Sequence, residues 1–202
     1  MKEIFEQEQE QEQEQELYNK RFELENAPDA GNLENTLQLA LLYTLAPWEN
    51  YAEAINVLEK SNEKDFKLQI IRAYLYGLNL DCTTNPALVA LFDTWEKWSG
   101  TEKAMIKYVE AYAADIRCDK SREEVISLLT ESIFWDSKLV NNFLQRYFLT
   151  HNYEDWLSAK KNVTRWISDE QCAEITIDEL IDPQAYIEEF ITGTTCVGEL
   201  PV

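Results

Sequence analysis

The chain has few of the residues that mark catalytic, metal-binding or β-rich proteins. Its four cysteines, Cys82, Cys118, Cys172 and Cys196, lie far apart without a C-x-x-C pair, so we expect neither a zinc site nor a disulfide framework. Five glycines and five prolines in 202 residues argue against an all-β fold with many tight turns. Because no nucleophile elbow, P-loop or dinucleotide-binding glycine motif occurs, we expect no enzyme and no cofactor.

Histidine and long apolar runs are also scarce. The single histidine, His151, falls at a predicted turn between helices, where a capping or surface role is expected. No stretch reaches the roughly 18 apolar residues of a membrane-spanning helix. Glu and Gln, rather than the apolar core of a signal peptide, follow the first five residues. We therefore expect a cytoplasmic protein that does not bind membranes.

The negative charge of the chain is concentrated at its two ends. The net charge is −20, and 45% of the residues are apolar, which is enough for a substantial core. Residues 1–30 contain ten acidic and three basic side chains, residues 31–166 contain 19 and 15, and residues 167–202 contain nine and none. Direct binding to nucleic acid needs clusters of Lys and Arg and is not expected. A basic protein partner is one interpretation of the acidic ends, and improved solubility alone is the other.

The segment 1–30 is distinguished by a run of alternating Glu and Gln from Glu6 to Glu16. Both residues favour helix, but Glu side chains four residues apart repel each other. We expect a frayed, solvated helix or disorder in this segment, and the residues 27–31 then break the chain.

Residues 31–166 predict four helical hairpins of similar length. First helices are expected to start near residues 33, 66, 102 and 138, and second helices near 48, 86, 121 and 152. Three helix-start signals support this register: Asn85 before Pro86, the capping-box pair Ser121 and Glu124, and Asn152. Residues 167–202 are expected to form an acidic C-terminal helical cap with a loose tail. The predicted fold class is all-α, with stacked antiparallel helical hairpins.

The start of the second predicted helix carries a family resemblance. The segment from Tyr51 to Ile55 resembles the second helix of a tetratricopeptide repeat, in which an aromatic residue is followed three positions later by a small one, here Ala54. The segment from Asn152 to Trp156 is similar, but Trp156 replaces the small residue. This resemblance implies a curved superhelix whose first helices line a concave, protein-binding surface.

The candidate binding residues come from the first helices and from the acidic C-terminal segment. Four residues of the first helices are expected on the concave surface: Arg72, Tyr76, Tyr112 and Tyr147. The candidate acidic residues are Asp169, Glu170, Asp178, Glu179, Asp182, Glu188 and Glu189. The spacing of these carboxylates does not match a calcium-binding loop, so no metal site is expected. The six tryptophans are assigned mostly to core packing, with Trp98 and Trp135 as candidates for exposed anchors.

An acidic chain without catalytic groups resembles the bacterial immunity proteins that neutralise secreted toxins. The expected function is therefore binding to a basic protein, such as a toxin or enzyme whose site is occluded. Two alternatives remain open: a helical-repeat chaperone or scaffold that binds an extended peptide, and a nucleic-acid mimic that blocks a DNA-binding protein. The sequence does not indicate the oligomeric state.

Overall fold

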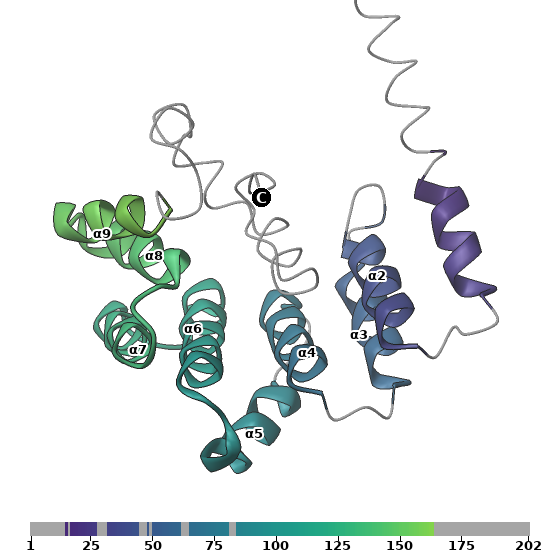
Figure 1. Ribbon diagram of the computed structural model, residues 1–202, viewed down its shortest axis with the longest axis horizontal. Helices are drawn as coiled ribbons and strands as arrows, with labels where there is room; N and C mark the ends of the chain where they lie inside the picture. Colours follow the sequence, from purple (N-terminus) through teal and green to yellow (C-terminus); the bar gives the residue numbers. More distant parts are fainter. Residues whose placement is uncertain are drawn as a thin grey trace, which may run out of the picture. The chain divides into compact units, whose positions relative to one another are not determined.

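The computed structural model describes residues 15, 17–27, 32–44, 48, 50–61, 65–80 and 84–163 (Figure 1). Every regular element among these residues is a helix, which confirms the predicted all-α class. The chain divides into two compact units, residues 1–64 and residues 65–202, and each is described by itself. No helix of the described segments is long and apolar enough to cross a membrane. The acidic segment 167–202 lies outside the described residues.

The first unit contains one helical hairpin, formed by α2 (Leu33–Thr44) and α3 (Tyr51–Glu59), which pack against each other. The side chain of Asn50 caps α3 by accepting a hydrogen bond from the Glu53 amide at 3.0 Å. The second helix thus begins three residues later than the sequence predicted. Ala54, the small residue of the tetratricopeptide-like pattern, is completely buried.

A polar and aromatic network joins helical residues 17–25 to this hairpin. The Tyr43 hydroxyl donates a hydrogen bond to Glu25 at 2.7 Å, and Glu25 also pairs with Arg21 at 3.0 Å. The Arg21 guanidinium lies over the rings of Tyr43 and Trp48, and Tyr18 meets the Trp48 ring edge-on at 5.0 Å. Burial, followed by the hydrogen bond to Glu25, raises the pKa of Tyr43 to about 12.

This raised pKa makes the stability of the first unit sensitive to alkali. Tyr43 ionises near pH 10 in the unfolded chain and near pH 12 in the folded chain, so its contribution is complete below pH 10 and is lost as the pH rises from 10 to 12. We expect the stability difference between the wild type and Tyr43→Phe to decrease over this range. Urea unfolding of both proteins at pH 9 to 12 measures it, and a constant difference would contradict the assigned pKa.

The second unit is a series of helices in which each packs on its neighbour. They are α4 (Phe66–Leu78), α5 (Pro86–Asp93), the 3₁₀ helix η1 (Trp95–Lys97), α6 (Gly100–Arg117), α7 (Arg122–Trp135), α8 (Val140–Thr150) and α9 (Tyr153–Val163). Helix α6 lies between α4 and α7, α5 packs on α4, and α8 packs on both α7 and α9 (Figure 1). The core side chains that are almost completely buried include Leu68, Leu75, Leu91, Ile106, Leu129 and Leu144.

Local capping signals explain where most of these helices begin. Asn85 caps α5, with Pro86 in its first turn, and Ser121 forms the predicted capping box with Glu124. The hydrogen bonds of Ser121 lower the pKa of the Glu124 carboxyl. Asn152 accepts a hydrogen bond from the Glu154 amide at the start of α9. A further capping box, Ser99 with Glu102, begins α6.

The apolar residues from Leu88 to Trp98 predict one continuous helix after Pro86, but this prediction is wrong, because α5 ends at Asp93. The Thr94 hydroxyl donates to the Ala90 carbonyl at 2.9 Å, and the Trp98 indole N–H donates to the Leu91 carbonyl at 3.1 Å. These side-chain donors satisfy carbonyls at the end of the helix, and the chain continues as the short 3₁₀ helix η1. Trp98 also packs on Phe66, with 4.9 Å between the ring centroids, which holds η1 near the start of α4.

Two features fix the spacing of the helices in the second unit. Gly77 of α4 lies so close to α6 that an added Cβ would stand 2.8 Å from the Ala113 Cβ. At the other end of the unit, Arg146 of α8 forms a two-point ion pair with Asp155 of α9, and the Arg146 Nε–Asp155 Oδ2 distance is 3.0 Å. The Arg146 guanidinium also donates to the Thr130 hydroxyl of α7 at 3.1 Å. One side chain therefore connects three helices.

Candidate partner-binding surface

Four aromatic rings from three elements gather on the second unit. Trp95 of η1 stacks on Phe92 of α5 at 5.7 Å and meets the ring of Trp135 edge-on at 5.8 Å. Phe134 extends the group, with its ring 5.7 Å from that of Trp135. Together with Lys103 of α6, these rings are called here the aromatic–lysine surface.

The packing of α7 on α6 determines which side chains reach this surface. Leu129 and Ser132 of α7 are buried, and the Ser132 hydroxyl donates to the Ala104 carbonyl of α6 at 2.6 Å. Successive residues of a helix point about 100° apart, and the rings of Phe134 and Trp135 still approach to 5.7 Å between centroids at the end of α7. The last turn of α7 is held to the start of α6 by the Thr101 hydroxyl, which donates to Asp136 at 2.7 Å.

Phe134 is the most exposed large apolar side chain of the described residues. It is 82% exposed, and its neighbour Trp135 is 38% exposed. Trp95 and Phe92 are half-buried and form the inner part of the aromatic–lysine surface. Exposed aromatic rings supported by half-buried ones are typical anchors of protein–protein interfaces, since they bury much apolar area at low cost in conformational entropy.

The lysines near the rings are held by the protein itself. The Lys103 ammonium lies 4.8 Å from the Trp135 centroid and 5.4 Å from that of Trp95. Lys107 pairs with Glu110 at 3.2 Å and with Glu131 at 3.0 Å. Burial alone would lower the pKa of Lys107, but the hydrogen bonds and charges of Glu131 and Glu110 outweigh it and raise that pKa. Lys107 therefore stays charged and is neutralised locally.

Carboxylates outnumber cations in the stretch of sequence that carries the aromatic–lysine surface. Three of its four rings are followed directly in sequence by an acid: Asp93 after Phe92, Glu96 after Trp95 and Asp136 after Trp135. Residues 92–136 contain ten acidic and six basic side chains. The side chains of Asp93 and Glu96 are exposed. An apolar anchor with surplus negative charge is complementary to a basic partner.

The candidate residues on α4 and α6 lie on neighbouring helices. Arg72 and Tyr76 of α4 are half-buried, as is Tyr112 of α6. Tyr112 stacks on Tyr74 of α4 at 5.1 Å and on Tyr108 of its own helix at 5.9 Å.

The remaining candidate residues lie on α8 or in the C-terminal segment 167–202, which is outside the described residues. Tyr147 is half-buried on α8, with its ring 6.2 Å from Trp156 of α9 and 6.3 Å from His151. His151 ends α8 in the left-handed conformation at φ 55° and is exposed, in agreement with its expected capping or surface role. The seven acidic candidates lie outside the described residues: Asp169, Glu170, Asp178, Glu179, Asp182, Glu188 and Glu189.

The expectation that the tryptophans pack mostly in the core holds in part: Trp156 packs against the buried cluster of Phe143 and Leu144, but no described tryptophan is fully buried. Trp48, Trp95, Trp98 and Trp156 are half-buried and Trp135 is exposed, while Trp166 lies outside the described residues. Three of them, Trp95, Trp98 and Trp135, lie in or beside η1 or at the last residue of α7. The adjacent aromatic residues Phe134 and Trp135 at a helix end were the sequence feature that could have indicated an exposed tryptophan.

Within the described segments, no group of three or more His, Cys, Asp or Glu side chains is placed to hold a metal ion. Comparison with known proteins found no matching family model, no similar curated protein and no similar solved structure. The class that the fold itself defines is an all-helical protein of packed neighbouring helices.

Proposed function

We propose that this chain is a protein-binding module whose partner is a basic protein. The observation that carries the proposal is the aromatic–lysine surface, with Phe134 exposed by 82% beside Trp135. An isolated exposed apolar residue needs no explanation, but a group of four rings in contact, one of them largely exposed, does. In the bound state the partner would cover Phe134 and Trp135 and place its cations against the surrounding acids.

The net charge of −20 supports an inhibitory role of the immunity type. A strongly acidic chain attracts a basic partner from a distance and speeds association, and buried aromatic anchors slow dissociation. In this proposal the chain occludes the site of a basic toxin or enzyme in the cytoplasm, and the acids of residues 167–202 add to the attraction.

The tetratricopeptide-like arrangement is part of the same proposal. Its support is the packing in the second unit, where the first helices α4 and α6 lie side by side and the second helices α5 and α7 pack on them. Arrays of helical hairpins of this kind serve mainly as binding scaffolds.

Affinity capture with one matched pair of variants tests the proposal. The wild type, Phe134→Asp and Phe22→Asp are immobilised and exposed to native lysate of the source cells at low salt. Phe22 is the matched control, because its side chain is 67% exposed and belongs to the first unit. We expect one basic protein in stoichiometric amount on the wild type and on Phe22→Asp, released by high salt. The Phe134→Asp variant should bind the captured basic protein about 30-fold more weakly, or weaker still, as expected for an interface hot spot.

The outcome distinguishes the alternatives. Equal recovery on Phe134→Asp and wild type would contradict the assignment of the surface. Many weakly bound proteins would support the peptide scaffold, and a captured DNA-binding protein displaced by DNA would support the nucleic-acid mimic. Because Phe134 is exposed, its replacement should leave the circular dichroism and melting temperature nearly unchanged, which serves as the folding control.

A further inference from the structure

Helix α9 has a buried face and an exposed face on opposite sides. Asp155, Ala159 and Asn162 are buried, and their spacing of four and three residues places them on one side of the helix. The other side carries Tyr153, which is 61% exposed, and Leu157, which is 40% exposed. Two large apolar side chains one turn apart are thus uncovered among the described residues.

The orientation of α9 is fixed from its buried side. Asp155 is held by the two-point ion pair with Arg146, and the Asn162 amide donates to the Ser137 carbonyl at 2.8 Å. These contacts anchor the first and last turns of the helix, so it cannot rotate to bury Tyr153 and Leu157. The contacts among the described residues of the second unit therefore keep this face exposed.

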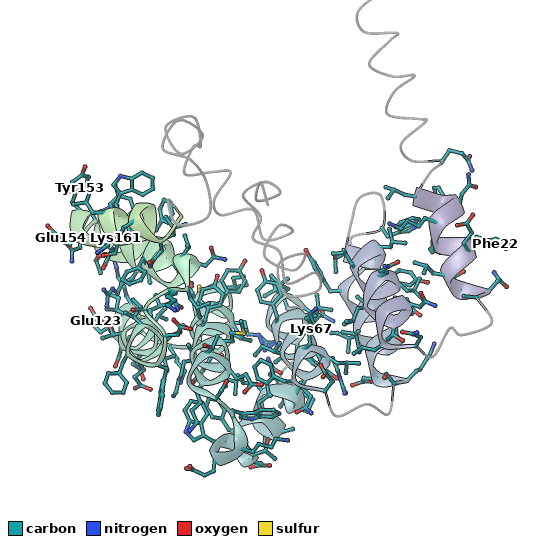
Figure 2. The ribbon with its side chains drawn as sticks, viewed as in Figure 1. Phe22, Lys67, Glu123, Tyr153, Glu154 and Lys161 are labelled. Carbon is teal, nitrogen blue, oxygen red and sulfur yellow. The ribbon has the colours of Figure 1, made fainter. Side chains whose placement is uncertain are left out.

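The charges on this exposed face follow a self-complementary order. Glu154 lies in the first turn of α9 and Lys161 in the last, and both side chains are exposed (Figure 2). They are seven residues apart, about two turns and 10 Å along the axis, so they share one side of the helix with Leu157 midway between them. If two such helices lie antiparallel, each Glu154 meets the Lys161 of the other copy.

We infer that the exposed face of α9 joins two copies of this chain about a two-fold axis. Leu157 packs on Leu157 at the axis, Tyr153 lies near the Lys161 stem of the other copy, and two Glu154–Lys161 pairs flank the contact. Two-fold interfaces require a surface that complements itself, and this order of acid, apolar centre and base meets that requirement. The inference does not depend on the aromatic–lysine surface, which is built from α5, η1, α6 and α7.

The dimer should be weak. A stable interface buries a total of about 1,200–2,000 Å². One pair of short helices buries less than this. The net charge of −20 on each copy also opposes association. At about 0.15 M salt the screening length is about 8 Å, so distant acids contribute little while ion pairs in contact persist. A dissociation constant on the order of 0.1 mM is expected for this contact.

Charge-reversal variants of the full chain test this pairing by sedimentation equilibrium. With Glu154→Lys, every charged side chain at the contact is a cation, and with Lys161→Glu every one is an anion. Each variant alone should therefore associate at least tenfold more weakly than the wild type. An equimolar mixture of the two should associate again, because each copy then supplies the charge that the other lacks. Glu123→Lys is the matched control, since Glu123 is an exposed carboxylate on α7 (Figure 2) and its reversal changes the net charge by the same amount.

Each possible result either supports or overturns the pairing of two α9 helices. Reduced association of both single variants, recovery in the mixture and wild-type behaviour of Glu123→Lys would support the antiparallel pair. A wild-type chain that stays monomeric at about 1 mM, ten times the expected dissociation constant, would overturn it. So would single variants that associate like the wild type, or a mixture that fails to recover.

Discussion

Replacing Arg146 by methionine is expected to lower the free energy of unfolding by about 3–5 kcal/mol. The substitution leaves the Asp155 carboxylate, whose side chain is 4% exposed, without the two hydrogen bonds that it receives from the guanidinium. A buried carboxylate that has lost its partner lowers the free energy of unfolding far more than the intact ion pair does, because neither water nor a cation solvates it. Urea denaturation followed by far-ultraviolet circular dichroism measures the loss.

A double variant separates the cost of the unpaired charge from the cost of altered packing. Arg146→Met combined with Asp155→Leu removes both charges, so we expect it to be more stable than Arg146→Met alone although it carries one more change. If Arg146→Met costs less than about 1 kcal/mol, the pair contributes no more than an exposed surface ion pair, and this account of the α8–α9 contact is wrong.

Replacing Gly77 by valine is expected to cost about 3 kcal/mol and to loosen the contact of α4 with α6. Even the first added carbon would stand 2.8 Å from the Ala113 Cβ and 3.3 Å from its Cα, distances that require the two helices to move apart. The added methyl groups increase the overlap in a region where Ala111, Ala113 and Ala114 are already buried. Valine also forms helix somewhat better than glycine, so a loss of stability would report on packing.

Exchanging the two residues provides the control. Gly77→Ala combined with Ala113→Gly keeps one Cβ at the contact, and the helix preferences gained and lost nearly cancel. We expect the exchanged protein to unfold within about 1 kcal/mol of the wild type. Wild-type stability in Gly77→Val, or equal instability in the exchanged protein, would contradict the close approach of α4 and α6.

The all-α class and the starts of several helices were the parts of the fold that could be predicted from the sequence. Asn85, Ser121 with Glu124, and Asn152 act through hydrogen bonds to amides two or three residues away, so their effect is visible in local sequence. The capping box of Ser99 and Glu102 carries the same local signal and begins α6 at Gly100, two residues before the predicted start near 102.

Features that depend on contacts between helices could not be predicted. Arg146 and Asp155 are nine residues apart and look like ordinary surface charges in sequence, yet in the structure they pair with each other and Asp155 is buried. Trp95 and Trp98 continue the apolar period of α5, but Thr94 and the Trp98 indole N–H bind its last carbonyls. Apolar periodicity shows which side chains share a face, and only tertiary packing determines whether another helix covers that face.

The aromatic–lysine surface is another feature that depends on contacts between helices. The sequence indicated Trp135 as a candidate exposed anchor, but it did not place Trp95 and Phe92 beside it, because these residues lie about 40 positions earlier in the chain. Their meeting depends on the packing of α7 on α6 and on the end of α5 at Asp93.

Hydrogen exchange of the chain with and without its captured basic partner tests the binding account most directly. The account predicts slower amide exchange in residues 92–98 and 131–136 on binding, since the partner covers the last turn of α7 and the η1 segment. Helix α9, whose exposed face belongs to a separate contact, should exchange at the same rate in both samples. Unchanged exchange in 92–98 and 131–136, with protection confined to other segments, would contradict the assignment of the aromatic–lysine surface as the binding site.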